Sequence, residues 1–256
     1  MKEIENILHC IEPINLKEMD GVRLMDRTDT KFTFDYARLT NILFVIAPYY
    51  RVLEIDEKRC FLYRTLYYDT QELQLYTRHH SGKLNRYKIR HRSYVETNTS
   101  YLEVKFKSNK GRTVKERIKH PTASSSWDET EKSFLEKKLP FDPMTLKPCL
   151  WVNYSRITLV NKQTAERVTI DIGINFASET DEQRFDNLVI AEVKQEKRQR
   201  SRFLEVMKEL KIKQGSISKY CMGVAVMMKG VKRNNFKESI QALKDITGYD
   251  YNTVTN

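Results

Sequence analysis

Glycine, proline and cysteine are scarce in this sequence of 256 residues. It contains 8 glycines, 6 prolines and 4 cysteines, and it has no long glycine-, serine- or proline-rich stretch that would act as a flexible linker. The cysteines lie far apart and form no C-x-x-C pair. The sequence therefore predicts neither a zinc site nor a disulfide framework, and free thiols in a reducing cytoplasm are expected.

Three sequence signals with clear functional meaning are also missing. No run of about 20 apolar residues could cross a bilayer, and residues 1–10 carry acids where a signal peptide needs an apolar core. No G-x-x-x-x-G-K-[ST] motif is present, so any ATP must be held by side chains and not by a P-loop. We expect a cytoplasmic chain without a transmembrane segment.

Positive charge is in excess. The formal net charge is +11, the isoelectric point is about 9.3, and charged residues make up 31% of the chain. This balance favours an anionic partner, such as a nucleic acid, an acidic membrane surface, a nucleotide or a polyphosphate.

Hydrophobic periodicity predicts helices near both ends and strands between them. Helical spacing covers 2–11, 35–48, 70–81, 128–139, 201–211, 216–228 and 235–248. Strand-like segments cover 22–34, 50–56, 59–68, 84–95, 100–108, 112–119, 150–161, 165–176 and 186–196. Short connections between the strands favour an antiparallel sheet or barrel with helices outside.

Cations recur at every second position along most of these strands. In "NRYKIRHRSY" (85–94), Arg86, Lys88, Arg90 and Arg92 share one face of the predicted strand. Other strands repeat the pattern, with carboxylates interspersed, at Lys31, Glu103, Lys105, Lys107, Lys115, Arg156, Arg167, Glu192 and Lys194.

Two arrangements explain this pattern. An ordinary antiparallel sheet would place its charged face in water. A closed barrel would place the charges inside, as a wet tunnel for a polyanion, because unpaired charges cannot line a dry core. We expect the second arrangement, since at least six strands carry cations in phase.

The sequence resembles the polyphosphate-polymerase domain of the vacuolar transporter chaperone (VTC) proteins in its bacterial form, a CYTH-like triphosphate tunnel metalloenzyme. The resembling segments are "MDRTDTKF" (25–32), "YYDT" (67–70), "YKIRHRSY" (87–94), "LEVKFK" (102–107), "TVKER" (113–117), "NYSRITL" (153–159), "RVTIDIG" (167–173), "LVIAEVK" (188–194) and "SISKY" (216–220).

The resemblance implies roles for individual residues. The implied catalytic cage is Lys31, Arg90, Arg92, Lys105, Lys115, Arg156, Arg167, Glu192 and Lys219. Phosphate ligands would be the cations of that set together with Lys107, Lys194 and Ser218. Glu192 would hold the metal, Mn²⁺ or Mg²⁺, with Glu103 as a second candidate ligand.

One departure affects the expected reaction. The CYTH opening E-x-E-x-K is here Arg27-x-Asp29-x-Lys31, and the missing carboxylate favours the VTC branch over the two-metal hydrolases. The resemblance implies transfer of the terminal phosphoryl group of ATP to inorganic polyphosphate, with release of ADP. A tripolyphosphatase or nucleoside triphosphatase, and a binding module without turnover, remain open.

Nucleic acid is not expected as a partner, because RNA-binding sheets expose stacking aromatics where this chain carries Arg and Lys. A membrane-protein partner, and a place at the inner face of the membrane, follow from the resemblance alone. We expect an α+β fold, with an antiparallel β-barrel of about eight strands and helices packed outside. Residues 1–256 would form one domain, with helices near 1–20 and 201–247 packing on the barrel.

Overall fold

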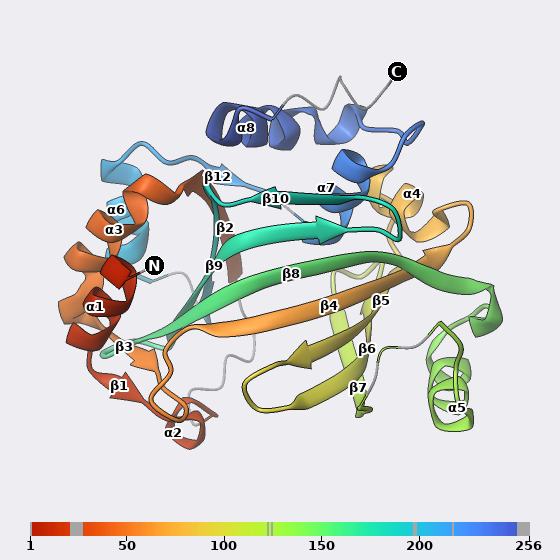
Figure 1. The fold of residues 1–256 in the computed structure, drawn as a ribbon, viewed down its shortest axis with the longest axis horizontal. Helices are drawn as coiled ribbons and strands as arrows, with labels where there is room; N and C mark the ends of the chain where they lie inside the picture. The colour runs from red at the N-terminus through yellow and green to blue at the C-terminus, as the bar shows by residue number, and fades with distance from the viewer. Residues whose placement is uncertain are drawn as a thin grey trace.

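The computed structural model describes residues 2–20, 28–121, 123, 125–196, 199–216 and 218–249, apart from the side chain of Asp20. One large, mostly antiparallel sheet forms the centre of the molecule, and helices surround it (Figure 1). Arg27 and the first part of the predicted strand 22–34 lie outside the described residues.

Twelve strands belong to this sheet. They are β1 (Pro13–Ile14), β2 (Thr28–Asp35), β3 (Tyr50–Leu53), β4 (Phe61–Thr70), β5 (Arg86–Tyr94), β6 (Thr99–Lys107), β7 (Thr113–Lys119), β8 (Leu146–Asn161), β9 (Glu166–Ala177), β10 (Glu182–Phe185), β11 (Leu188–Gln195) and β12 (Gln214–Gly215). The main path runs β12-β2-β11-β9-β8-β4-β5-β6-β7. In addition, β10 pairs with β9, and β3 pairs with β8 and, in parallel, with β1.

The two ends of this path approach each other but are not paired. Lys105 in β6 interacts electrostatically with Lys31 in β2 and Glu192 in β11, so the sheet curves strongly and brings opposite ends together. Among the described residues, however, β12 pairs only with β2, and β7 pairs only with β6. The expected closed barrel is therefore wrong. The two-residue β12 leads almost directly into a helix and offers no further backbone for β7 to pair with.

Helices cover the outer face of the sheet and one end of its inner face. The α-helices are α1 (Lys2–Cys10), α2 (Leu16–Asp20), α3 (Leu39–Ile46), α4 (Gln74–His80), α5 (Glu129–Lys138), α6 (Arg202–Glu209), α7 (Lys219–Met227) and α8 (Lys237–Thr247). The short 3₁₀ turns are η1 (Tyr36–Arg38), η2 (Ala47–Tyr49), η3 (Pro143–Thr145) and η4 (Asn234–Phe236). In Figure 1, α1, α3 and α6 lie together at the left of the sheet, and α8 lies at the top.

Alternation along the strands separates an apolar face from a charged face. In β9, Val168, Ile170 and Ile172 are fully buried in a core shared with the apolar sides of α1, α3 and α6. Arg167, Thr169 and Asp171 alternate with them and point to the other side. Burial of this first face supplies most of the driving force for docking the helices.

The helix α7 occupies one end of the inner face. Its Tyr220, Met222 and Val224 join a core with Leu150 of β8 and Phe176 of β9. Because α7 is buried on almost every side, it is held firmly, and its N-terminal residues Ser218 and Lys219 are placed toward the charged part of the sheet.

The predicted α+β class, with an antiparallel sheet and helices outside, is confirmed. Sequence periodicity missed three short strands, β1, β10 and β12, which carry too few residues to show alternation. The assignment of residues 1–256 to one domain stays a prediction. Within the described part of the chain, no helix is long and apolar enough to span a bilayer.

We expect Gly223→Ala to destabilise the protein, because α7 packs too closely at this position for a methyl group. An added Cβ would clash with Leu150 and lie 2.8 Å from Cδ1 of Phe176. Overpacking of this kind costs about 1–3 kcal/mol, which urea unfolding would measure. Gly215→Ala is the matched control, since a Cβ there meets nothing within 4 Å. Equal stability of the two variants would contradict the tight packing of α7.

Candidate functional site

The hairpins β5–β6 and β6–β7 stack cations in register across three strands. Lys88 lies opposite Lys105, which lies opposite Lys115. One step along the sheet, Arg90 lies opposite Glu103. Like charges placed side by side repel, so such a ladder is stable only with counter-charge or water nearby. We call the side of the sheet that carries these residues the cationic face.

Glu103 neutralises two cations of this ladder. Its carboxylate oxygens lie 2.6 Å from Nε of Arg90 and 2.7 Å from Nζ of Lys115. Burial opposes ionisation of Glu103, but the charges of its cationic neighbours outweigh burial and lower its pKa to about 2. Glu103 is therefore a permanent anion that orients Arg90 and Lys115.

Glu192 holds a second pair of cations, on the opposite part of the curved sheet. Its oxygens lie 3.0 Å from Nζ of Lys194 and 3.9 Å from Nζ of Lys31, and Lys31 faces it directly in β2. Burial again opposes ionisation, and the charges of Lys194 and Lys31 overcome it to lower the pKa of Glu192 to about 2. Its contact with Lys31 is loose compared with the contacts of Glu103.

Asp171 holds a third pair and connects the sheet to α7. It accepts two hydrogen bonds from Arg156, from Nε at 2.6 Å and from Nη2 at 2.8 Å, and it also pairs with Lys219. Burial disfavours the charged form, yet Arg156 and Lys219 lower the pKa of Asp171 well below its usual range. This network fixes the first residue of α7 against β8 and β9.

Tyrosine rings lie beneath the cations. The guanidinium of Arg156 lies 4.9 Å from the ring centroid of Tyr63 and 5.2 Å from that of Tyr154. Nζ of Lys219 lies 4.8 Å from the Tyr154 ring. Nη1 of Arg90 donates to the hydroxyl of Tyr67 at 3.2 Å. Such cation–π and hydrogen-bond contacts limit the motion of long side chains.

Among the described residues, Lys88, Arg92 and Lys105 of the cationic face form no ion pair with a carboxylate. Lys88 donates to Oγ of Ser218 at 2.8 Å, and Nε of Arg92 lies 3.4 Å from Oγ1 of Thr65. The side chain of Lys105 makes no hydrogen bond or ion pair with a described residue. Partial burial, followed by the charges of Lys88 and Lys31, lowers the pKa of Lys105 to about 8.

The structure brings most of the predicted site residues together. The charged face shared by these strands and the start of α7 includes Lys31, Arg90, Arg92, Lys105, Lys115, Arg156, Glu192, Lys194, Ser218 and Lys219. Arg167, opposite Lys194, and Lys107, opposite Arg86, share this face but lie nearer the ends of their strands. Glu103 and Glu192 belong to separate ion-pair clusters.

Sequence reasoning missed several residues of this face. Lys88 shows the same alternation as its neighbours and could have been included on that signal. Asp171 has no role that local sequence indicates, because only the fold reveals its pairing with Lys219 of a distant helix. Tyr67 likewise joins this face only in the fold, and its pKa is lowered to about 8, since Arg90 and Arg92 outweigh its burial.

The carboxylates of the cationic face differ in their capacity to hold a divalent metal. Both oxygens of Glu103 have cations within 2.7 Å, which leaves no oxygen directed elsewhere. Glu192 has one close cation and one at 3.9 Å, and Asp29 lies on the neighbouring strand opposite Lys194. Hard oxygen ligands of this type suit Mg²⁺ and Mn²⁺, so Glu192 is better suited than Glu103 to bind a divalent metal ion.

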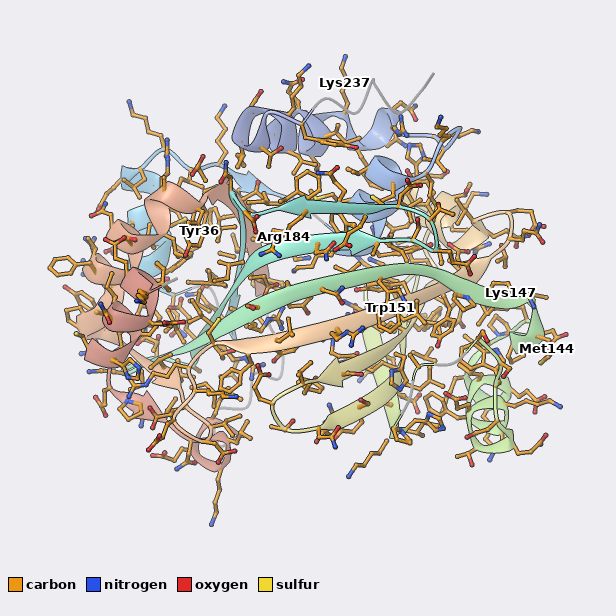
Figure 2. The ribbon with its side chains drawn as sticks, viewed as in Figure 1. Tyr36, Met144, Lys147, Trp151, Arg184 and Lys237 are labelled. Carbon is orange, nitrogen blue, oxygen red and sulfur yellow. The ribbon has the colours of Figure 1, made fainter. Side chains whose placement is uncertain are left out.

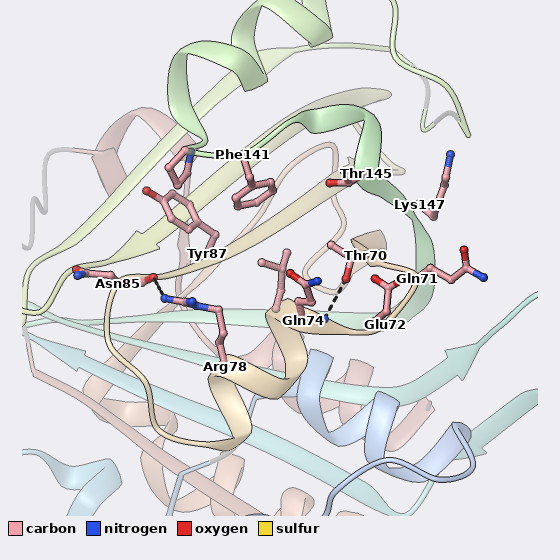
Figure 3. Close-up of a pocket in the computed structure, with 12 residues that line it drawn as sticks. Thr70, Gln71, Glu72, Gln74, Arg78, Asn85, Tyr87, Phe141, Thr145 and Lys147 are labelled. Carbon is pink, nitrogen blue, oxygen red and sulfur yellow. Dashed lines mark hydrogen bonds between the residues drawn. The ribbon is translucent and has the colours of Figure 1, made fainter.

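A separate pocket lies on the other side of β5 (Figure 3). Its volume is about 500 Å³, and it is bounded by α4, the start of β5 and the segment that joins α5 to β8. Its lining includes Tyr87, which alternates with Arg86 and Lys88 along β5. The pocket and the cationic face are therefore on opposite faces of the same strand.

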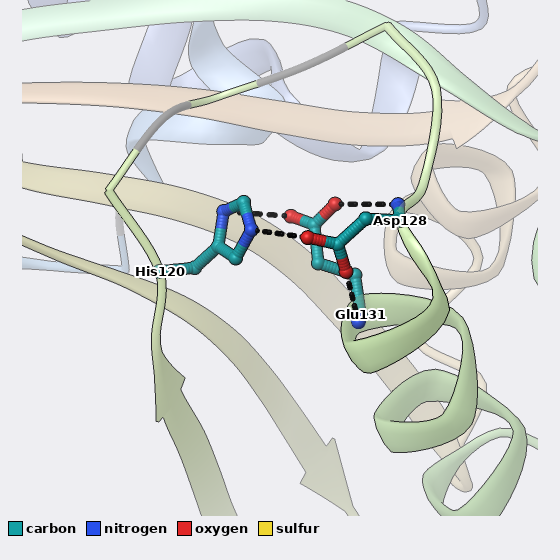
Figure 4. A group of neighbouring side chains, drawn as sticks. All are labelled: His120, Asp128 and Glu131. Carbon is teal, nitrogen blue, oxygen red and sulfur yellow. Dashed lines mark hydrogen bonds and ion pairs between the residues drawn. The ribbon is translucent and has the colours of Figure 1, made fainter.

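A group of metal-ligating residues occurs at the start of α5 (Figure 4). Nε2 of His120 lies 2.7 Å from Oδ2 of Asp128, and Nδ1 lies 3.3 Å from Oε1 of Glu131. The same two carboxylates form a capping box with each other's backbone N–H groups. Sequence spacing gave no sign of this group, since its histidine and acids come from a loop and a helix. The hydrogen bonds of these residues stabilise the first turn of α5, so we assign them a structural role.

The fold is similar to those of proteins with solved structures. The chain is similar to a structure from Hippeastrum described as a candidate adenylyl cyclase with a dominant triphosphatase activity, with a TM-score of 0.50 and 12% identity over 78% of this chain and 95% of that one. It is also similar to a structure from Bacillus halodurans described as an adenylate cyclase, with a TM-score of 0.43 and 14% identity over 76% and 96% of the two chains. No curated protein matches the sequence.

The family itself is given by sequence. Residues 26–228 match the VTC domain, and this range contains every strand of the cationic face together with Ser218 and Lys219. The match covers most of the chain and confirms the resemblance drawn from the strand motifs. The chain belongs to the VTC domain family.

Proposed function

We propose that the protein transfers phosphoryl groups on its cationic face, with ATP as donor and the end of an inorganic polyphosphate chain as acceptor, releasing ADP. The observation that carries this proposal is the incomplete neutralisation of the cationic face. Glu103, Asp171 and Glu192 each hold two cations, while Lys88, Arg92 and Lys105 pair with no carboxylate of the described residues. A chain of phosphates supplies the missing negative charge.

Each group of residues has a separate role in this proposal. Arg90, Arg92 and Arg156 grip phosphate oxygens, because a guanidinium can bind two oxygens at once. Lys31, Lys88, Lys105, Lys107, Lys115, Arg167 and Lys194 add positive charge along the chain of phosphates. Ser218 and Lys219 bind phosphate at the N-terminal end of α7, where the helix dipole also favours anions.

No covalent nucleophile is required for this reaction. Phosphoryl transfer is catalysed mainly by positioning and by stabilising charge on the transferred group. The carboxylates and tyrosines beneath the cations hold their side chains in place before substrate arrives, which reduces the reorganisation needed in the transition state. When bound, Mn²⁺ or Mg²⁺ would be held by Glu192 and would neutralise phosphate oxygens.

Hydrolysis on the same face is the second candidate. The Hippeastrum protein, which shares this fold, is reported with triphosphatase activity, and the two reactions differ only in whether water or a phosphate end attacks. We propose a cytoplasmic location and a single functional domain. A membrane-protein partner is a further proposal that rests on the VTC family alone.

Phosphorus NMR of the protein with ATP and Mn²⁺, followed over hours, tests the proposed reaction. We expect an internal-phosphate resonance to grow beside ADP, with faster growth when a short polyphosphate primer is added. If orthophosphate and ADP form instead, the protein is a hydrolase and not a polymerase. An unchanged ATP spectrum, with and without primer, would remove both enzymatic assignments.

We expect Glu192→Gln to lose metal-dependent turnover while keeping the fold. The amide has the shape of the carboxylate but lacks the charge that attracts a divalent ion, so turnover should fall by about 100-fold or more. Glu182→Gln, on the exposed strand β10, is the matched control. Tripolyphosphate binding without metal should survive in both variants, and turnover within about twofold of wild type would remove Glu192 from this role.

Binding of tripolyphosphate should weaken as the pH rises from 7 to 9. The pKa values of Lys105 and Lys115 are lowered to about 8, so both side chains are charged at pH 7 and largely neutral at pH 9. Each lost charge should reduce affinity by about tenfold over this range.

Lys105→Arg tests the origin of this pH dependence, because arginine stays charged throughout. The decline in affinity should be shallower in this variant than in wild type. Measuring the two proteins side by side cancels the titration of tripolyphosphate itself. Identical profiles would mean that Lys105 does not meet the phosphate chain.

A further inference from the structure

The pocket behind β5 has a clear division between aromatic and polar walls. Tyr87 and Phe141 lie toward one side in Figure 3, and Lys147 lies toward the opposite side. The Tyr87 ring is fixed by stacking on Phe106, with centroids 4.6 Å apart, and by an edge contact with Phe141 at 6.0 Å. These rings form a rigid apolar wall of the kind that accepts a planar ligand group.

The polar wall is rich in hydrogen-bonding groups and carries more positive than negative charge. Arg78, on the Tyr87 side in Figure 3, and Lys147, on the opposite side, line the pocket together with one carboxylate, Glu72. Nη2 of Arg78 donates to the backbone carbonyl of Asn85 at 3.3 Å, which leaves its remaining N–H groups for a ligand. The side chain of Lys147 makes no hydrogen bond or ion pair with a described residue, and it is exposed.

The amide and hydroxyl groups of the lining favour a ligand with several polar atoms. Gln74 and Thr145 border the space between the aromatic wall and Lys147, and Gln71 lies on the Lys147 side. A cavity of about 500 Å³ lies within the usual range for small-molecule sites, which is about 300–1,000 Å³. The lining therefore favours a ligand that has a flat ring at one end, polar groups in the middle and an anionic group at the other end.

We propose that this pocket binds a nucleotide, separately from the cationic face. The base packs against Phe141 and Tyr87 with the Arg78 guanidinium beside it, the ribose meets the amide of Gln74, and the phosphates reach Lys147. The inference rests on the residues of the pocket and holds whether or not the cationic face catalyses phosphoryl transfer.

The pocket adjoins the cationic face through two shared elements. In α4, Arg78 lines the pocket, while the next residue, His79, has its pKa lowered to about 2 by burial and by the charges of Lys88 and Arg86. In β5, Tyr87 lines the pocket between those same two cations. A nucleotide bound here therefore contacts the elements that position Arg86 and Lys88, without entering the cationic face.

Isothermal titration calorimetry of the whole protein tests the site, with ADP as the probe and saturating tripolyphosphate present. We expect ADP to bind to wild type and to bind at least about tenfold more weakly to Arg78→Glu and Lys147→Glu. Lys237→Glu is the control, since Lys237 is exposed on α8, far from the pocket in Figure 2. The preceding tripolyphosphate titration reports on the cationic face and therefore tests the proposed function separately.

The ring-binding half of the site is tested by Phe141→Ala with two ligands. Because Phe141 is half-buried at the edge of its core, the variant should stay folded. It should weaken ADP about tenfold or more, and wild type should bind pyrophosphate much more weakly than ADP. The proposal is overturned if ADP does not bind, if the Arg78 and Lys147 variants bind it like wild type, or if pyrophosphate binds as tightly as ADP.

Discussion

The architecture of this protein depends on how carboxylates reduce the repulsion between like charges on one face of the sheet. Each of three buried or half-buried carboxylates is shared between two cations, on three different parts of the sheet. Removing one partner from a buried pair costs about 3–5 kcal/mol, because the other charge stays buried without compensation. The carboxylates must therefore remain ionised, and the lowered pKa values of Glu103 and Glu192 show that their cations keep them so.

This electrostatic requirement also explains the place of α7. The helix fills one end of the inner face with apolar side chains, and its first residue, Lys219, pairs with Asp171, while its N-cap, Ser218, accepts from Lys88. The helix thus joins strands from distant parts of the sheet path by side-chain contacts. These contacts connect β9 with β5, which are separated by β8 and β4 along the sheet path.

Much of this arrangement follows from local sequence, and the rest does not. Alternation predicted the strands and the face of each cation, because side-chain direction in a strand depends only on position. Helix starts at Asp128 and Ser201 were also predictable from capping chemistry. The pairing of Asp171 with Lys219 was not, since it joins residues far apart in the chain. The group around His120 was not either, because a loop brings the histidine back onto the start of α5. Closure was predicted wrongly because alternation gives no information on which strands pair at the sheet edges.

The same imbalance separates a ligand site from a merely structural ion network. In a structural network each cation would find its own carboxylate, whereas Lys88, Arg92 and Lys105 form no ion pair with a carboxylate among the described residues. Burial is the largest cause of the lowered pKa values of Lys88, Lys105 and Lys115, and neighbouring cations add to it. A bound polyanion would raise those pKa values again, because its negative charge favours the protonated lysines. The cations without a carboxylate partner come from different strands, so alternation along single strands could not reveal this imbalance, which supports the proposed polyanion site.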